Sequence, residues 1–177
     1  MLTARNQCLT LRKGRVGLIS DTHGLLRPEA LAALKGSELI IHAGDIGKPE
    51  VLESLTSIAP VIAIRGNNDR GPWVKKLPDI FNAQINGIQI HVIHNVKEMV
   101  NDPSVDGIKL VVSGHSHVPG VLKRDGMLFI NPGSAGPRRF KLPVTVVRLN
   151  LGGVNPRARI VELKVCGNFI DFDFAAR

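Results

Sequence analysis

In the first half of the chain, short apolar runs alternate with amphipathic segments that begin with proline. Buried strands are expected at 16–20, 38–43 and 61–65, because each is a brief apolar run bounded by polar or glycine residues. Helices are expected at 28–34 and 49–58, each led by proline, which is favoured in the first turn of a helix. This order predicts parallel strands joined by right-handed crossovers.

The second half of the chain predicts hairpins. The apolar runs 80–85 and 88–93 flank Asn86-Gly87, a dipeptide typical of a type I′ turn. A single strand is expected at 109–113, and two further hairpins pair 118–123 with 127–131 and 144–149 with 157–165. We therefore expect an α/β protein in which two mixed sheets pack together between flanking helices, a four-layer α-β-β-α sandwich.

The length of 177 residues suits one domain, which we assign to residues 16–177. Residues 1–15 are basic and contain no acid, but lack the apolar segment and cleavage site of a secretory signal. They are expected to form a poorly ordered N-terminal extension. The sequence contains no run of about 18 apolar residues, so no membrane span is predicted. The two cysteines lack motif spacing, which favours a reducing cytoplasmic location.

The net charge of +8 favours an anionic partner, either a small phosphate ester or a nucleic acid. The basic residues are scattered, and aromatic residues make up only 4% of the chain, whereas proteins that bind single strands need several exposed rings. A stable nucleic-acid partner is therefore not expected. The hairpin edges would allow two subunits to pair in a homo-oligomer, although nothing in the sequence requires it.

Seven residues with side chains that bind metals stand in five short blocks, most of them at the end of a predicted strand. Ligands of α/β sheets bind at the carboxyl ends of strands. Two members of a block that are two positions apart would point the same way in an extended backbone. Carboxylate, imidazole and amide donors without thiolate indicate a two-metal hydrolytic centre rather than a structural zinc site. The seven residues are Asp21, His23, Asp45, Asn67, His94, His115 and His117.

Four other residues have simpler interpretations. His42 lies inside an apolar run and is expected to be a core histidine. His91 would lie on the opposite face of its strand from His94. Trp73 and Phe140 are expected to be packing residues rather than surfaces on which a substrate stacks.

The ordered series Asp-x-His, Gly-Asp, Gly-Asn-x-Asp, His and Gly-His-x-His resembles the calcineurin-like metallophosphoesterase superfamily. The short chain, with Asn131-Pro132-Gly133-Ser134 after the last block, is similar to its small bacterial and archaeal phosphodiesterase branch. The eukaryotic retromer subunit Vps29 is similar to that branch. The resemblance covers about residues 16–150 and implies a metallo-dependent phosphatase-like fold.

The resemblance also implies two divalent ions and a bridging hydroxide as nucleophile. The first ion would be held by Asp21, His23, Asp45 and His117, and the second by Asp45, Asn67, His94 and His115. Asp45, Asn67, Asp69 and His94 are the expected catalytic residues. Nitrogen and oxygen ligands without sulfur favour Mn²⁺, with Fe, Zn²⁺, Ni²⁺ and Mg²⁺ as alternatives.

The expected reaction is hydrolysis of a small phosphodiester, with a small phosphomonoester as the alternative substrate. Asn68 stands where members of the superfamily often have a histidine that protonates the leaving group, so the general acid is open. Asp69 would serve as that acid or would orient its neighbours. Asn68, Arg70 and Arg138, or Arg139 in place of Arg138, would contact the substrate. The alternative function is a non-catalytic protein-interaction scaffold of the Vps29 type.

Overall fold

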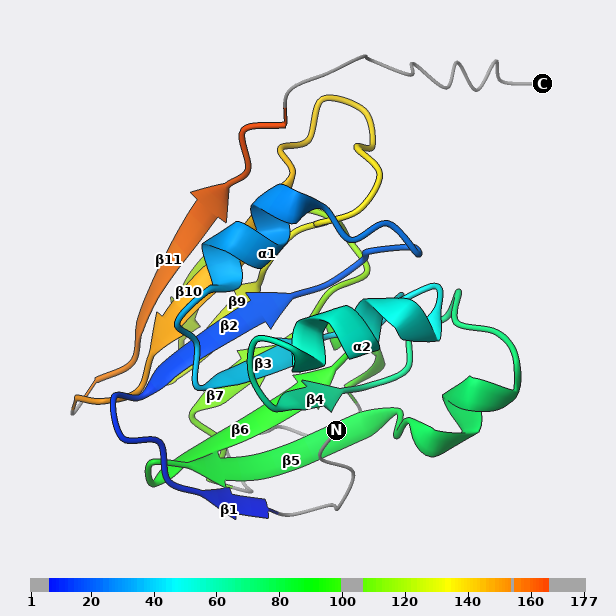
Figure 1. The fold of residues 1–177 in the computed structure, drawn as a ribbon. Coiled ribbons are helices and arrows are strands. Elements are labelled where there is room, and N and C mark those ends of the chain that lie inside the picture. The colour runs from blue at the N-terminus through cyan, green and yellow to red at the C-terminus, as the bar shows by residue number, and fades with distance from the viewer. Residues whose placement is uncertain (1–6, 100–106, 154, 166–177) are drawn as a thin grey trace.

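The computed structural model describes residues 7–99, 107–153 and 155–165, which form two sheets packed face to face (Figure 1). The five-stranded sheet has the order β11-β10-β2-β3-β4. Its first three strands along the chain are parallel and are connected by two helices, as predicted. The elements are β2 (Arg15–Ile19), α1 (Pro28–Leu34), β3 (Leu39–His42), α2 (Pro49–Thr56), β4 (Val61–Ala63), β10 (Thr145–Asn150) and β11 (Arg157–Glu162).

The six-stranded sheet has the order β1-β5-β6-β7-β9-β8 and contains two of the predicted hairpins. Asn86 and Gly87 both have positive φ, 49° and 80°, as a type I′ turn requires. The hairpin β10–β11 belongs to the other sheet. The elements are β1 (Gln7–Leu9), β5 (Ile80–Ile85), β6 (Ile88–Ile93), β7 (Leu110–Val112), β8 (Gly120–Arg124) and β9 (Met127–Asn131), with the 3-10 helices η1 (Pro72–Lys76) and η2 (Val96–Glu98).

Two apolar clusters hold the layers together. One lies between the sheets and includes Leu18, Ile41, Phe81 and Leu110, all fully buried. The other joins both helices to the outer face of the five-stranded sheet. The prediction of two mixed sheets with helices is therefore confirmed. In the described part of the chain, however, both α-helices cover the outer face of the five-stranded sheet.

The expectation of a poorly ordered extension is wrong for residues 7–15. Strand β1 pairs in parallel with β5, and Cys8 stands opposite Gln84. The backbone N–H of Leu11 donates to Asn86 Oδ1 at 2.7 Å, and Arg15 already belongs to β2. Leu9 and Leu11 pack on the core between the sheets, which gives this segment an apolar reason to dock. The rest of the predicted extension, residues 1–6, lies outside the described residues. No described helix is long and apolar enough to cross a membrane.

Two phenylalanines allow a matched test of the packing. Phe81 is 0% exposed between the sheets, whereas Phe140 is 92% exposed. Phe81→Ala should lower the free energy of unfolding by about 3–5 kcal/mol, because it removes buried apolar surface and leaves a cavity. Phe140→Ala should change it by less than about 0.5 kcal/mol. Urea unfolding of both variants measures the difference, and equal losses would contradict the placement of the core.

Candidate metal centre

The candidate ligands lie where the strands of the two sheets end at the same side of the sandwich. Asp21 and His23 follow β2, Asp45 follows β3 and Asn67 follows β4. The other sheet supplies His94 after β6 and the pair His115 and His117 after β7. Two crossovers and the contact between the sheets thus bring the sequence blocks together.

The first group contains Asp21, His23 and His117. Asp21 Oδ1 lies 3.3 Å from His117 Nε2 and 4.0 Å from His23 Nε2. The two imidazoles are stacked, with 3.4 Å between their Nε2 atoms. Three ligand atoms that all lie within 4.8 Å of one another can hold one cation.

The second group contains Asn67, His94 and His115. Asn67 Oδ1 lies 3.1 Å from His94 Nε2 and 3.0 Å from His115 Nδ1. His94 Nδ1 lies 2.7 Å from the carbonyl oxygen of Ala43, which can only accept a hydrogen bond. Nδ1 therefore carries the proton when the ring is neutral, the form in which Nε2 could bind a cation. Burial opposes a charge on this ring, but hydrogen bonds to Asp45 and to the Ala43 carbonyl outweigh it and raise the pKa of His94, and the protonated ring donates from Nε2 to Asp45.

Asp45 stands between the two groups and offers one carboxylate oxygen to each. Its Oδ2 lies 3.8 Å from His23 Nε2, and its Oδ1 lies 3.5 Å from His94 Nε2. The carboxylate is 2% exposed, so both oxygens are directed by the protein rather than by solvent. A carboxylate in this position is suited to bridge two cations.

The side chains fit divalent cations in their chemistry as well as in their positions. Asp21 Oδ1 and His117 Nδ1 are buried and have no hydrogen-bond partner. A buried carboxylate oxygen without a partner is unfavourable, and a cation beside it would remove that cost. Carboxylate, imidazole and amide donors match the harder and borderline divalent ions.

The backbone at the ligands is left-handed rather than extended. Five ligand residues have positive φ, so the expectation that the pairs converge in extended backbone is wrong. For residues other than glycine this conformation costs on the order of 1 kcal/mol each, and it clusters at functional sites. The values are 53° for Asp21, 45° for His23, 53° for Asp45, 66° for His115 and 58° for His117.

Main-chain hydrogen bonds hold these turns in place. Beyond the ends of β2 and β3, the N–H of Asp21 donates to Gly44 O at 3.0 Å and the N–H of His23 to Asp45 O at 2.9 Å. The N–H of Gly24 donates to Ile46 O at 2.7 Å. This loop ladder, the three hydrogen bonds made by Asp21, His23 and Gly24, fixes the Asp-x-His turn relative to Asp45.

Asn68 and Asp69 both make hydrogen bonds within the centre. Asn68 donates from its backbone N–H to Asp45 Oδ1 at 2.8 Å and from Nδ2 to Asp45 Oδ2 at 2.6 Å. Asp69 is 2% exposed, and its two oxygens accept the backbone N–H groups of Gly47 and Gly66 at 2.7 and 2.8 Å. These contacts favour the positioning role for Asp69 and give Asn68 a partner other than a substrate.

Of the two neighbouring arginines, Arg139 reaches the centre. Its Nη2 lies 3.4 Å from His23 Nε2, whereas Arg138 Nε donates to the carbonyl of Leu142 at 3.2 Å. Of the two arginines proposed from the sequence as alternatives, Arg139 is therefore the one that lies beside the candidate ligands. Adjacent residues of one type cannot be told apart by sequence, because only the conformation of their loop decides which one points inward.

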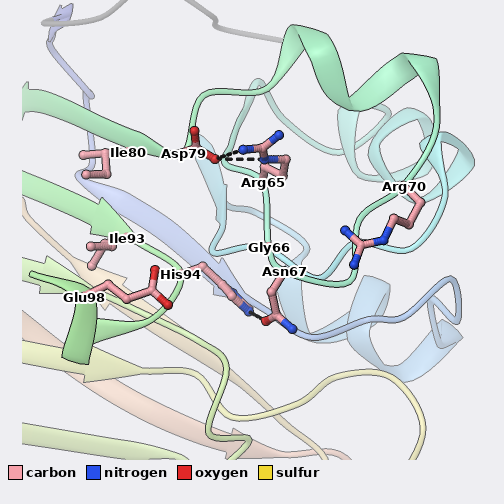
Figure 2. Close-up of a pocket in the computed structure, with 9 residues that line it drawn as sticks. All are labelled: Arg65, Gly66, Asn67, Arg70, Asp79, Ile80, Ile93, His94 and Glu98. Atoms are coloured by element: carbon pink, nitrogen blue, oxygen red, sulfur yellow. Dashed lines mark hydrogen bonds and ion pairs between the residues drawn. The ribbon is translucent and has the colours of Figure 1, made fainter.

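Arg70 lines a cavity of about 400 Å³ that adjoins the second group (Figure 2). Asn67 and His94 form part of its wall, so the cavity opens directly onto candidate metal ligands. Three charged residues in it escaped the sequence analysis, since isolated charges outside a motif carry no signal. The lining residues are Arg65, Gly66, Asn67, Arg70, Asp79, Ile80, Ile93, His94 and Glu98.

The residues set aside in the sequence have mixed outcomes. His42 is fully buried, and its Nε2 lies 2.9 Å from Thr22 Oγ1, as expected of a core histidine. His91 Nδ1 lies 2.7 Å from Asn82 Oδ1 across the β5–β6 pair, away from the centre. Trp73 packs against the cluster beneath the helices. The prediction that Phe140 is a packing residue is wrong, since its side chain is 92% exposed.

Burial and hydrogen bonds set the charge of the centre. Burial raises the pKa of Asp21 to about 6. Burial opposes the charge on Asp45 too, but hydrogen bonds from His94 and Asn68 outweigh it and hold that pKa below its usual range. Burial and the charge of Arg139 lower the pKa of His117 to about 4, and burial also lowers that of His23. Both imidazoles are therefore neutral at neutral pH, the form that binds metals.

A two-sheet α/β fold with carboxylates, imidazoles and an amide gathered at its strand ends is that of a metal-dependent hydrolase. The chain belongs to the calcineurin-like phosphoesterase superfamily, whose domain matches residues 15–153. This match confirms the resemblance noted in the sequence. The site therefore lies in a domain of a phosphoester hydrolase family.

Archaeal relatives support this assignment. A probable metallophosphoesterase of Methanothermobacter thermautotrophicus is 32% identical over 159 residues, which cover 83% of this chain and 91% of that protein. A probable metallophosphoesterase of Methanocaldococcus jannaschii is 36% identical over 135 residues, which cover 67% of each chain. A phosphodiesterase of the same organism is 27% identical over 67% of this chain and 82% of its own length.

Solved structures with the same fold belong to enzymes and to sorting proteins. A novel archaeal phosphodiesterase superposes with a TM-score of 0.65 at 24% identity, covering 83% of this chain and 99% of its own. Vps29 of Chaetomium thermophilum superposes with a TM-score of 0.68 at 16% identity, covering 83% and 96%. At these identities the likeness shows the fold alone.

The raised pKa of Asp21 predicts how pH affects the metal-free protein. A carboxyl group whose pKa rises from 3.8 to about 6 on folding favours the folded state only while it is protonated. Its contribution is present below about pH 4 and is lost as pH rises through about 6, a change on the order of 3 kcal/mol. With EDTA present, Asp21→Asn should therefore become more stable relative to the native protein between about pH 4 and about pH 7.

Urea unfolding across that pH range measures the difference between the two proteins. The same substitution at Asp125, whose side chain is 73% exposed, controls for the amide itself. A difference between Asp21→Asn and the native protein that does not change with pH would contradict burial as the cause.

Proposed function

We propose that this protein is a two-metal phosphodiesterase for a small substrate. The superfamily supports a metal-dependent phosphoester hydrolase in general. The observation that carries the finer proposal is the position of Asp45, which directs one oxygen to His23 and the other to His94. Two cations would need a carboxylate that stands between two groups of ligands. A single cation would need only one of these groups.

Each ion would have four ligands from the chain. When bound, two divalent ions supply a water of lowered pKa and neutralise charge on the phosphate. We infer Mn²⁺ from the nitrogen and oxygen donors, with Fe, Zn²⁺, Ni²⁺ and Mg²⁺ as alternatives. The first set is Asp21, His23, Asp45 and His117, and the second is Asp45, Asn67, His94 and His115.

The two arginines beside the centre would bind the phosphate. Arg139 Nη2 lies within 3.4 Å of His23, and Arg70 lines the cavity on the side of Asn67. A guanidinium pairs with two phosphate oxygens at once, and phosphoryl transfer depends mainly on positioning and on charge neutralisation. Asn68 and Asp69 hold Asp45 and the turn at Gly66 rigid while this happens.

A diester is the proposed substrate class. Archaeal matches in sequence and in structure are named as phosphodiesterase. Asn68 occupies the position of the expected proton donor, and its Nδ2 donates a hydrogen bond to Asp45 Oδ2 at 2.6 Å. The remaining candidate, Asp69, has both oxygens bound to main-chain N–H groups. We therefore infer that the leaving group is protonated by water.

A protein-interaction scaffold is the second candidate function. It is supported by the likeness of the fold to Vps29 of several organisms, with TM-scores between 0.59 and 0.68. The complete ligand set favours hydrolysis, because a scaffold needs neither the strained turns nor a buried carboxylate oxygen without a partner. A metal-loaded protein without phosphoesterase activity would favour the scaffold.

Asp45→Asn tests the bridge. The metal-free protein is loaded with Mn²⁺, its bound metal is counted by elemental analysis, and hydrolysis of bis(4-nitrophenyl) phosphate is compared with that of 4-nitrophenyl phosphate. We expect two ions per chain and faster cleavage of the diester in the native protein. Asp45→Asn should lose at least one ion and about 10²-fold or more of kcat/KM. Full activity in Asp45→Asn, or a single ion at saturating Mn²⁺, would contradict the mechanism.

Arg139→Gln tests phosphate binding, with Arg138→Gln as the matched control. A hydrogen bond from a charged group is worth about 1.5–3 kcal/mol, so kcat/KM for the diester should fall about 10–100-fold in Arg139→Gln. Arg138→Gln should stay within about twofold of the native protein, because Arg138 binds the Leu142 carbonyl instead. Equal losses in the two variants would show that Arg139 has no special role.

A further inference from the structure

We propose that the 400 Å³ cavity beside the second ligand group binds the organic substituent of the ester, and that it selects a substituent with neighbouring hydroxyl groups. This inference rests on the proposed phosphodiesterase function and deepens it. A diester carries two organic groups, and a cavity that begins at candidate metal ligands is placed to receive one of them while the phosphate occupies the centre.

The position of the cavity follows from the open edge of the sandwich. Its walls come from the loop after β4, the beginning of β5, the end of β6 and η2 (Figure 2). Asn67 and His94 lie at its inner end, and Ile80, Ile93 and Glu98 lie farther from the centre. Its volume lies in the range in which proteins bind small organic molecules, about 300–1,000 Å³.

The charges in the cavity divide into a neutralised pair and two separate groups. Arg65 donates from Nη2 and Nε to Asp79 Oδ1 at 2.6 and 2.8 Å, so these two charges largely cancel. Arg70 lies on the side of Asn67, where the phosphate would be. Glu98 lies on the opposite side of Asn67 from Arg70 and contributes a carboxylate where no phosphate is expected.

Glu98 is held ready to accept hydrogen bonds. Its Oε1 accepts from Asn95 Nδ2 at 3.0 Å, and Asn95 Oδ1 in turn accepts from the backbone N–H of Lys97 at 3.1 Å. The capped turn η2 thereby orients the carboxylate, which has further lone pairs for a ligand. Two neighbouring hydroxyls can donate to one carboxylate, the arrangement by which acidic side chains bind ribose in nucleotide sites.

The apolar part of the cavity suits the carbon frame of such a group. Ile93 is 4% exposed and forms a fixed wall, whereas Ile80 is 42% exposed and offers its side chain to a ligand. A second phosphate is disfavoured in this part because Glu98 would repel it. The chemistry therefore fits a neutral, hydroxyl-bearing substituent, which a ribonucleoside or a glycerol group would supply.

Four esters with the same leaving group test the proposal. They are the 4-nitrophenyl phosphodiesters of adenosine through its 5′ oxygen, of 2′-deoxyadenosine through its 5′ oxygen, of glycerol, and of 4-nitrophenol itself. The Mn²⁺-loaded native protein should cleave the adenosine ester about tenfold faster in kcat/KM than the deoxyadenosine ester, because a hydrogen bond to a charged group is lost. The ratio should fall to about one in Glu98→Gln, with the bis(4-nitrophenyl) ester unaffected.

Glu53→Gln is the control, since Glu53 is an exposed residue of α2. The glycerol ester distinguishes the two sources of the hydroxyls. A fall in kcat/KM for both the adenosine and the glycerol ester in Glu98→Gln supports the proposal. A higher kcat/KM for the adenosine ester than for the glycerol ester identifies the nucleoside as the source. A preference for adenosine that survives Glu98→Gln, or an equal loss on all four esters, would overturn it. Failure of the proposed function looks different, because then none of the four esters is cleaved by the native protein.

Discussion

The centre depends on main-chain hydrogen bonds that continue beyond the ends of the strands. Parallel pairing of β2 and β3 ends at Ile19 and His42, yet the loop ladder carries on through Asp21, His23 and Gly24. Side chains alone would not hold five residues in left-handed backbone, since each conformation is unfavourable. The ladder fixes these turns before any ion binds, and a similar bond from Gly114 N to His94 O, 2.9 Å long, joins the ligand turns of the other sheet.

Electrostatics and strain act against the folded state at the same place. The centre gathers two buried carboxylates, imidazoles with lowered pKa and several unfavourable backbone turns within a few strand ends. The surrounding polar contacts offset part of this cost: Ser20 Oγ donates to Asp21 Oδ2 at 2.6 Å, and Asn68 holds both oxygens of Asp45. What they leave unsatisfied, Asp21 Oδ1 above all, is what a cation would complete.

Most of the fold and the identity of the candidate ligands could be predicted from sequence, because both follow local patterns. Asn86-Gly87 determines a turn, and proline at 28 and 49 determines where helices begin. The conformation of the ligand turns could not be predicted, because Asp and His are enriched in left-handed backbone but adopt it in only a small fraction of their occurrences. Docking of β1 depends on pairing with β5, 76 residues away along the chain, and the inward turn of Arg139 depends on loop geometry. The exposure of Phe140 likewise could not be predicted, because it depends on the conformation of its loop.

The inner wall of the centre consists of backbone at three glycines. A Cβ at Gly44 would stand 2.6 Å from His94 Nδ1, and one at Gly66 or Gly114 would collide with Asp45 or Ser20. A side chain added at any of these three glycines would therefore collide with the candidate ligands or the residues beside them. Under the proposed function, specificity would change through substitutions at the rim, at Glu98, Arg70 and the loop of Arg139. The architecture thus separates the three glycine positions, where a side chain is not tolerated, from the rim, where substitutions are tolerated.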